Sequence, residues 1–206
     1  MTTHTRDYVA VYADESCLGN GREGGNPGGA GGLIEWQSPR TGMIRRWDFW
    51  AAEPATTNNR MALRSVIEAF RGLSAKGRKL NVRFTTDSRY IVDGMTSWVH
   101  GWIERGWRRK GGAIENLELW QEAVASIGAH VVQWEWVRGH AGQPQNEYAN
   151  HLATRAAAEQ TSSDGFRASE FERWLRSRSE RAAKLNEAAP LPRHETFKPS
   201  RRIWTT

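Results

Sequence analysis

The pattern of hydrophobic and polar positions predicts a domain that begins with strands. The first apolar, β-branched run covers residues 7–14 and ends on Asp14, and two further strand patterns cover 33–36 and 43–50. A turn-rich segment joins the last two runs, so we expect three antiparallel strands. The glycine-rich stretch 15–32 between the first two has the composition of an irregular loop, and it lacks the Gly-Lys-Ser/Thr ending of a phosphate-binding loop.

Helical periodicity begins after the third strand. Apolar residues recur at spacings of three and four from Leu63 to Leu73, behind candidate N-cap residues at 56–59, and a strand pattern at 80–86 then ends on Asp87. Further helices are expected at 88–100, 115–127 and 146–160, and an alternating strand at 131–137. This order predicts an α/β fold: a five-stranded mixed sheet, three antiparallel strands followed by parallel additions, with helices on both faces.

Length and composition limit the class of protein. The chain has 206 residues, enough for one domain of roughly 150 residues and a smaller extension. Its one cysteine, Cys17, excludes an internal disulfide framework and favours a reducing compartment. No apolar run approaches the ~20 residues of a membrane helix, and the first residues do not resemble a signal peptide. We therefore expect a cytoplasmic monomer.

The charge of the chain indicates a polyanionic partner. The formal net charge is +6 and the pI about 9.9, which favours nucleic acid first and a membrane surface second. Eleven tryptophans are present, an unusually high number. Four of them lie in one basic neighbourhood: Trp98, Trp102, Trp107 and Trp120. Aromatic rings among cations favour nucleic acid over membrane.

Two acids, Asp14 and Asp87, stand at the ends of predicted strands. A single aspartate in that position more often bonds to its own turn than serves in a site. Two such acids on neighbouring strands favour a catalytic or metal site, because the strand ends bring them together.

Five segments in chain order resemble ribonuclease HI, the enzyme that hydrolyses the RNA strand of RNA–DNA hybrids. The resemblance runs from about residue 7 to 158 and rests on residues 14–20, 56–61, 86–88, 98–107 and 134–142. It implies a ribonuclease H-like domain over residues 1–158, with RNA–DNA hybrid as the partner.

The resemblance also implies four carboxylates that hold up to two Mg²⁺ ions, with Mn²⁺ as a possible substitute. The first and third acids of the family fall on Asp14 and Asp87. The second falls on Ala62, which offers no ligand, and the fourth on Asn150, whose neutral amide oxygen is a weaker ligand than a carboxylate. The expected metal ligands are therefore Asp14, Asp87 and Asn150.

Three explanations of the two replaced acids stay open. Glu15, beside Asp14, compensates in a natural enzyme, although strict strand alternation points its side chain away from that of Asp14. Alternatively, the protein binds RNA–DNA hybrid or double-stranded RNA without turnover. In the third explanation, Ala62 and Asn150 are engineered replacements that disable the site.

The resemblance assigns further residues to catalysis and to substrate binding. His140, in a glycine-rich loop, matches the family's mobile histidine, which assists proton transfer and product release. The hybrid-recognition set is either Asn20 or Asn26, together with Thr57, Asn58 and Asn59, where Thr57 is also a candidate helix cap. A basic protrusion that grips the DNA strand would comprise Trp98, Trp102, Trp107, Arg108, Arg109 and Lys110.

Residues 159–206 lie beyond the resemblance. They form a basic extension, in which we expect one short helix at about 169–186 and then a disordered tail. A second nucleic-acid contact there is an alternative to a simply solvated tail.

Overall fold

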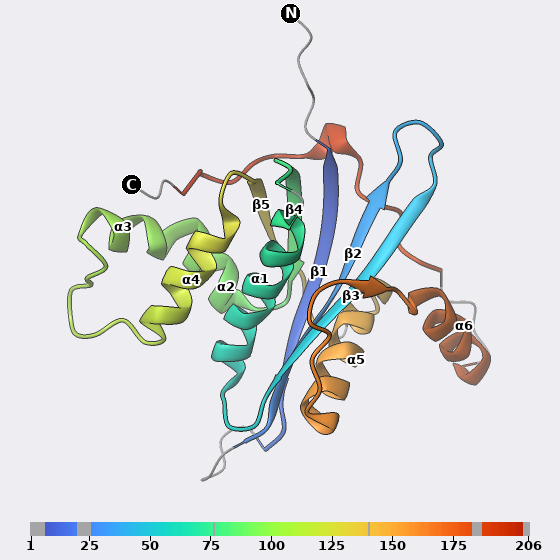
Figure 1. Ribbon diagram of the computed structural model, residues 1–206, viewed down its shortest axis with the longest axis horizontal. Helices are drawn as coiled ribbons and strands as arrows, with labels where there is room; N and C mark the ends of the chain where they lie inside the picture. The colour runs from blue at the N-terminus through green and yellow to red at the C-terminus, as the bar shows by residue number, and fades with distance from the viewer. Residues whose placement is uncertain (1–6, 20–25, 76, 140, 183–186, 204–206) are drawn as a thin grey trace, which may run out of the picture.

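The fold is organised around a six-stranded mixed sheet, shown in Figure 1. The computed structural model describes residues 7–19, 26–75, 77–139, 141–182 and 187–203. The spatial order of the strands is β5-β4-β1-β2-β3-β6. They are β1 (Tyr8–Cys17), β2 (Gly28–Gln37), β3 (Ile44–Glu53), β4 (Asn81–Thr86), β5 (Val131–Trp136) and β6 (Arg167–Ala168).

The strand directions confirm the predicted mixed sheet. Strands β1, β2 and β3 pair antiparallel, while β4 pairs parallel with β1 and β5 pairs parallel with β4. The sixth strand was not predicted: β6, only two residues long, pairs antiparallel with β3 and comes from the extension beyond residue 158.

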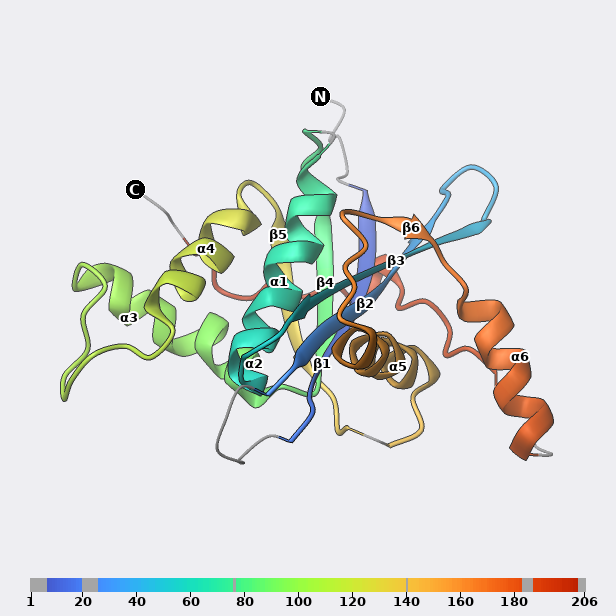
Figure 2. The same ribbon diagram turned by 60° about the horizontal axis from the view of Figure 1, so that its bottom comes forward.

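Helices cover both faces of the sheet (Figure 2). Helix α1 (Asn58–Ser74) packs on one face with α4 (Leu117–Ile127) against it, and α5 (Pro144–Glu159) packs on the other face. Alternate residues of β1 serve the two cores: Val9 and Val11 face the first, while Ala10 and Tyr12 face the second. This period of two follows from the pleat of the strand.

The helical region after β4 is one nearly continuous run. It comprises α2 (Arg89–Asp93), a π-helical turn η1 (Gly94–Trp98) and α3 (Val99–Glu104). The predicted helix ended at His100, four residues too early. The cations of the predicted basic protrusion, Arg108, Arg109 and Lys110, come after α3. They lie in the loop 105–116 that projects from the end of this run (Figure 1), which we call the basic loop.

The glycine-rich segment before residue 33 corrects the predicted loop. Strand β2 begins at Gly28, and two of its glycines, Gly29 and Gly31, lie against α5. A Cβ at Gly29 would come within 2.2 Å of the Ala153 carbonyl oxygen, and one at Gly31 within 2.4 Å of the Ala153 nitrogen. The glycines therefore allow helix and strand backbones to approach closely, a use that their composition alone does not reveal.

The C-terminal extension packs on the domain. Helix α6 (Phe171–Ala182) buries Phe171 fully beside Tyr148 of α5. Residues 187–203 then cross the sheet as an extended segment with one 3₁₀ turn, η2 (His194–Thr196). The Ser200 N–H donates to the Val132 carbonyl at 2.9 Å, and Arg83 donates to Thr196. The predicted short helix agrees with α6, whereas the predicted disorder of 187–203 differs from the structure.

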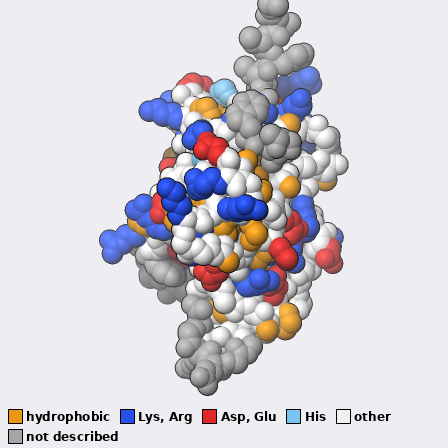
Figure 3. All heavy atoms as spheres, turned by 90° about the vertical axis from the view of Figure 1, so that its left-hand side faces the viewer, with side chains coloured by type: hydrophobic (Ala, Val, Ile, Leu, Met, Phe, Trp, Pro, Cys, Tyr) orange, Lys and Arg blue, Asp and Glu red, His pale blue; other side chains and the backbone are white. Residues whose placement is uncertain are grey.

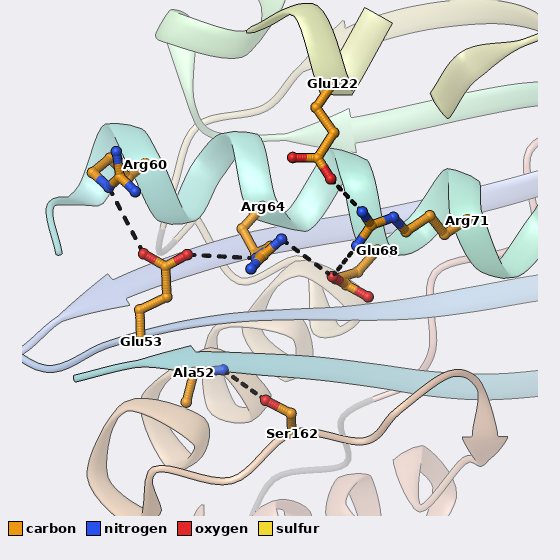
Figure 4. Close-up of polar contacts among 8 residues, drawn as sticks. All are labelled: Ala52, Glu53, Arg60, Arg64, Glu68, Arg71, Glu122 and Ser162. Atoms are coloured by element: carbon orange, nitrogen blue, oxygen red, sulfur yellow. Dashed lines mark hydrogen bonds and ion pairs between the residues drawn. The ribbon is translucent and has the colours of Figure 1, made fainter. Parts of the chain in front are cut away.

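Ion pairs connect α1 to its neighbours on the protein surface (Figure 4). Glu53, at the end of β3, lies 3.8 Å from Arg60 and 3.5 Å from Arg64, and Arg71 pairs with both Glu68 and Glu122 of α4. Such partly exposed pairs are individually weak, so they orient α1 more than they stabilise it. Among the described residues, no helix combines the length and apolarity needed to cross a membrane.

Candidate active site

Strand register places the two predicted acids side by side. In the parallel pairing of β1 with β4, Ala13 lies opposite Thr86, so Asp14 and Asp87 follow at the same level. Parallel neighbours in register point their side chains to the same side of the sheet. The Asp87 carboxylate also packs against loop backbone, because a Cβ at Gly139 would lie 2.2 Å from its Oδ2. The site thus forms where both strands end.

Glu15 joins these two acids. One carboxylate oxygen from each of Asp14, Glu15 and Asp87 lies within 4.8 Å of the others, and we call these three residues the acidic cluster. The expectation that alternation would point Glu15 away is therefore wrong. Strand β4 ends at Thr86 while β1 continues to Cys17, so beyond Ala13 the β4 side of β1 has no neighbouring strand. The long Glu15 side chain can turn around that open edge.

Burial and mutual repulsion dominate the electrostatics of the acidic cluster. Desolvation raises the pKa of Asp14 to about 8, and the charges of Asp87 and Glu147 act in the same direction. Desolvation, followed by the charges of Asp14 and Asp87, raises the pKa of Glu15 well above its ordinary value. A hydrogen bond from the Glu15 N–H to Asp14 Oδ1, at 2.7 Å, opposes the shift of Asp14 only in part. The cluster therefore resists holding three negative charges unaided.

This donor set fits a divalent cation. Hard cations such as Mg²⁺ and Mn²⁺ prefer carboxylate oxygens, and a nearby positive charge removes the repulsion that raises the pKa values. Glu15 Oε2 is buried and, among the described residues, has no hydrogen-bond partner. Buried polar atoms normally have a hydrogen-bond partner. A carboxylate oxygen without one, beside two other carboxylates, is therefore placed to bind a metal ion.

The remaining positions that the resemblance assigns to catalysis lie on α1, on α5 and in the chain segment before α5. Asn150 lies half-buried on α5, one turn after Glu147. Ala62 is fully buried in α1, within the core that also contains Ala13 of β1. His140 lies outside the described residues.

The predicted hybrid-recognition residues surround the start of α1. The Thr57 hydroxyl caps the helix by accepting a hydrogen bond from the Arg60 N–H at 3.4 Å. Asn58 Oδ1 is buried and, in the described part of the chain, lacks a hydrogen-bond partner, while Asn59 occupies the first helical turn. The Asn26 carbonyl accepts from the Thr56 N–H at 2.9 Å, and Asn20 lies outside the described residues.

Some side chains of the predicted basic protrusion are buried in the core and others are exposed on the surface. Trp102 and Trp120 are buried, whereas Trp98 is 39% exposed and Trp107 is half-buried. Arg108, Arg109 and Lys110 are exposed in the loop after α3. Figure 3 shows basic side chains gathered on this end of the molecule. The cations are thus available to a ligand, while Trp102 supports the helix from inside.

One pair beside the acidic cluster was missed from the sequence. The Arg89 guanidinium lies 3.9 Å from the centre of the Trp136 ring, and the Trp136 indole donates a hydrogen bond to the Asp87 carbonyl at 2.9 Å. Trp136 is 38% exposed. The only available signal was its position at the end of the alternating β5 strand, opposite the end of β4.

Comparison with known proteins identifies the family. The sequence pattern of RNase H matches residues 6–158. Ribonuclease H from Rhodospirillum rubrum is 40% identical over 152 residues, which cover 73% of this chain and 84% of that protein. The chain belongs to the ribonuclease H family.

Solved structures extend the comparison. LC9-RNase H1, described as a type 1 RNase H with the type 2 active-site motif, is 62% identical, with a TM-score of 0.89 over 96% of this chain and 93% of that chain. A foamy viral protease-reverse transcriptase, solved in complex with RNA/DNA hybrid, covers 75% of this chain at 16% identity and a TM-score of 0.57, with 20% of its own chain covered. The second likeness shows the fold alone. The ribonuclease H-like fold and a family relationship to ribonuclease HI are thereby confirmed.

Proposed function

We propose that this protein binds RNA–DNA hybrids and hydrolyses their RNA strand with Mg²⁺, for which Mn²⁺ can substitute. The observation that carries the proposal is the acidic cluster at the ends of β1 and β4. A divalent cation bound there would supply an activated water and stabilise the leaving oxygen. The family relationship and the basic loop after α3 give the substrate class: a polyanionic nucleic acid.

Within this proposal, Glu15 takes the place of the missing acid at Ala62. Asp14, Glu15, Asp87 and the Asn150 amide oxygen would hold the metal. Its proximity to Asp14 and Asp87 supports Glu15 as a ligand, and so does the similarity to a relative described as carrying the active-site motif of a different type. Of the three explanations of the replaced acids, we therefore favour natural compensation. His140 stays the predicted group for proton transfer and product release.

The substrate would lie across the cluster, between the start of α1 and the basic loop. Thr57, Asn58, Asn59 and Asn20 or Asn26 would bind 2′-hydroxyls and a DNA phosphate, as amides and hydroxyls can. Asn58 Oδ1, which is buried and has no hydrogen-bond partner among the described residues, supports that role. Trp98, Trp107, Arg108, Arg109 and Lys110 would grip the DNA backbone, with Trp102 supporting them from the core.

The test is a cleavage assay on a labelled RNA–DNA hybrid with Mg²⁺ and Mn²⁺ titrated separately. The unmodified protein should cut the RNA strand only when a divalent ion is present, and Asp87→Asn should reduce the rate by more than about a hundredfold, because it removes a charged ligand. Hybrid binding without cleavage under either metal would instead support the alternative of a binding protein without turnover.

A further inference from the structure

Helix α6 is fixed rigidly beside α5. Phe171 is fully buried, Leu175 is 8% exposed, and the Trp174 ring lies 5.1 Å from the Tyr148 ring and 6.0 Å from the His151 ring. These contacts fix both the position of α6 and the face that it presents. A side chain on the same face, one or two turns later, is therefore held in a defined place rather than on a mobile tail.

Arg178 is that side chain. Its guanidinium lies 5.1 Å from the centre of the Trp174 ring and 3.6 Å from the Glu147 carboxylate of α5. The side chain remains 47% exposed. Within the part of the chain that the structure describes, Arg178 makes these two contacts, and neither is within hydrogen-bond distance. Arg178 is thus held in place while its N–H donors stay available to a ligand.

Arg178 is linked to the acidic cluster through Glu147. Glu147, its partner, stands in the first turn of α5 and is close enough to Asp14 for the two charges to interact. Figures 1 and 2 show α6 and α3 at opposite ends of the molecule, with the ends of β1 and β4 between them. A duplex that crosses the cluster from the basic loop after α3 would extend toward α6.

We propose that Arg178 binds a backbone phosphate of the nucleic-acid duplex, so that the C-terminal helix extends the substrate surface beyond the ribonuclease H core. The proposal rests on the proposed function, since it needs the duplex to lie over the acidic cluster. The planar guanidinium matches the geometry of a phosphate and can donate two parallel hydrogen bonds to it. A half-exposed pair with Glu147 at 3.6 Å is weak enough to exchange for that contact.

The test compares Arg178→Ala with Arg173→Ala. Arg173 is a matched control because it lies on the same helix, is exposed, and pairs with Glu170, the residue just before α6, at 2.6 Å. Binding of a fluorescent RNA–DNA hybrid is measured in EDTA, so that no cleavage occurs, over a series of salt concentrations. Arg178→Ala should weaken binding about three- to tenfold at low salt and reduce the log–log salt slope by about 0.7 to 0.9, the value of one phosphate contact.

The control and a conservative variant separate the possible outcomes. Arg173→Ala should leave the hybrid affinity and the salt slope unchanged. Arg178→Lys should retain the slope and lose part of the affinity, because lysine keeps the positive charge but cannot donate two parallel hydrogen bonds to a phosphate. If the unmodified protein binds hybrid and Arg178→Ala has the slope of Arg173→Ala, the proposal is overturned while the proposed function stands. A lowered melting temperature with an unchanged slope would likewise reduce Arg178 to a structural partner of Glu147. If the unmodified protein binds no hybrid, both proposals fail.

Discussion

Two groups of buried acids in this protein share a raised pKa but differ in their partners. Glu35 and Asp48 lie under α5 and α6, where Arg46 Nε is 2.6 Å from Glu35, and Asp48 accepts hydrogen bonds from the Tyr148 hydroxyl at 2.6 Å and the Glu170 N–H at 3.1 Å. Their pKa values are raised by burial, and hydrogen bonds then oppose that effect. In the acidic cluster, the charges of other acids add to burial instead.

The difference separates a structural role from a functional one. Glu35 forms an ion pair and Asp48 forms hydrogen bonds with other protein groups, and these contacts hold β2, β3 and the C-terminal extension together. Acids that face each other destabilise the fold until a cation arrives, so their placement has to be explained by what they bind.

Among the variants that test this division, Glu15→Gln should have the largest effect. It should lower the cleavage activity without lowering the stability of the fold. It removes a charged metal ligand, so hybrid cleavage in Mg²⁺ should fall by more than about a hundredfold. Thermal stability without metal should not fall, because the change removes a carboxyl group whose charged form burial and the neighbouring acids disfavour. Exposed Glu118→Gln, on α4, is the control and should match the unmodified protein in both assays.

Arg46→Ala should show the opposite pattern. It leaves Glu35, which is fully buried, without its charged partner, and should lower the free energy of unfolding by about 3 kcal/mol. Neighbouring Arg45, which is exposed, is the control and should cost less than about 0.5 kcal/mol when replaced by alanine. Denaturant unfolding measures both. Equal effects for the two variants would contradict a structural role for the Glu35–Arg46 pair.

The pH dependence of stability should identify Asp14 directly. Its pKa is about 8 in the folded protein, against 3.8 for the unperturbed group. Between these values the folded state holds a proton that the unfolded state has lost, so metal-free stability should fall as pH rises from about 4 to about 8. Asp14→Asn should remove this contribution, which makes the variant relatively more stable at pH 8 than at pH 4. Melting temperatures of both proteins in EDTA across this range provide the measurement.

Glu53→Ala should have the smallest effect. Its ion pairs with Arg60 and Arg64 are partly exposed and longer than 3.4 Å, so the free energy of unfolding should change by less than about 1 kcal/mol. Added salt should shrink the difference between the variant and the unmodified protein further, because it screens surface charges. A loss comparable to that of Arg46→Ala would show that surface pairs matter as much as buried ones here.

The sequence was informative wherever the structure depends on local pattern. Asp14 and Asp87 could be predicted because each follows an apolar strand, and Thr57 because helix caps have a residue preference. Glu15 was misplaced because alternation holds inside a sheet, whereas β1 extends beyond the end of β4. The start of β2 was missed because Gly29 and Gly31 reflect close contact with α5, which lies over a hundred residues later.

The extension was hardest to predict for the same reason. Its composition is polar and basic, which is typical of a disordered tail. Its order comes from long-range contacts. Phe171 packs on Tyr148, and the Ala189 backbone exchanges two hydrogen bonds with the Gln145 side-chain amide. Ser200 forms hydrogen bonds with β5. The apolar stripe at Phe171, Trp174 and Leu175 predicts the helix, but the contacts of Ala189 and Ser200 leave no periodic signal in residues 187–203.

The most direct test of the acidic cluster is calorimetric titration of the metal-free protein with Mn²⁺, comparing the unmodified chain with Glu15→Gln and Glu118→Gln. If Asp14, Glu15 and Asp87 together hold the ion, Glu15→Gln should weaken Mn²⁺ binding by more than about tenfold, since it replaces a carboxylate with a neutral amide. Glu118→Gln should bind Mn²⁺ as the unmodified protein does. Equal Mn²⁺ affinity of Glu15→Gln and the unmodified protein would contradict the assignment of Glu15 as a metal ligand.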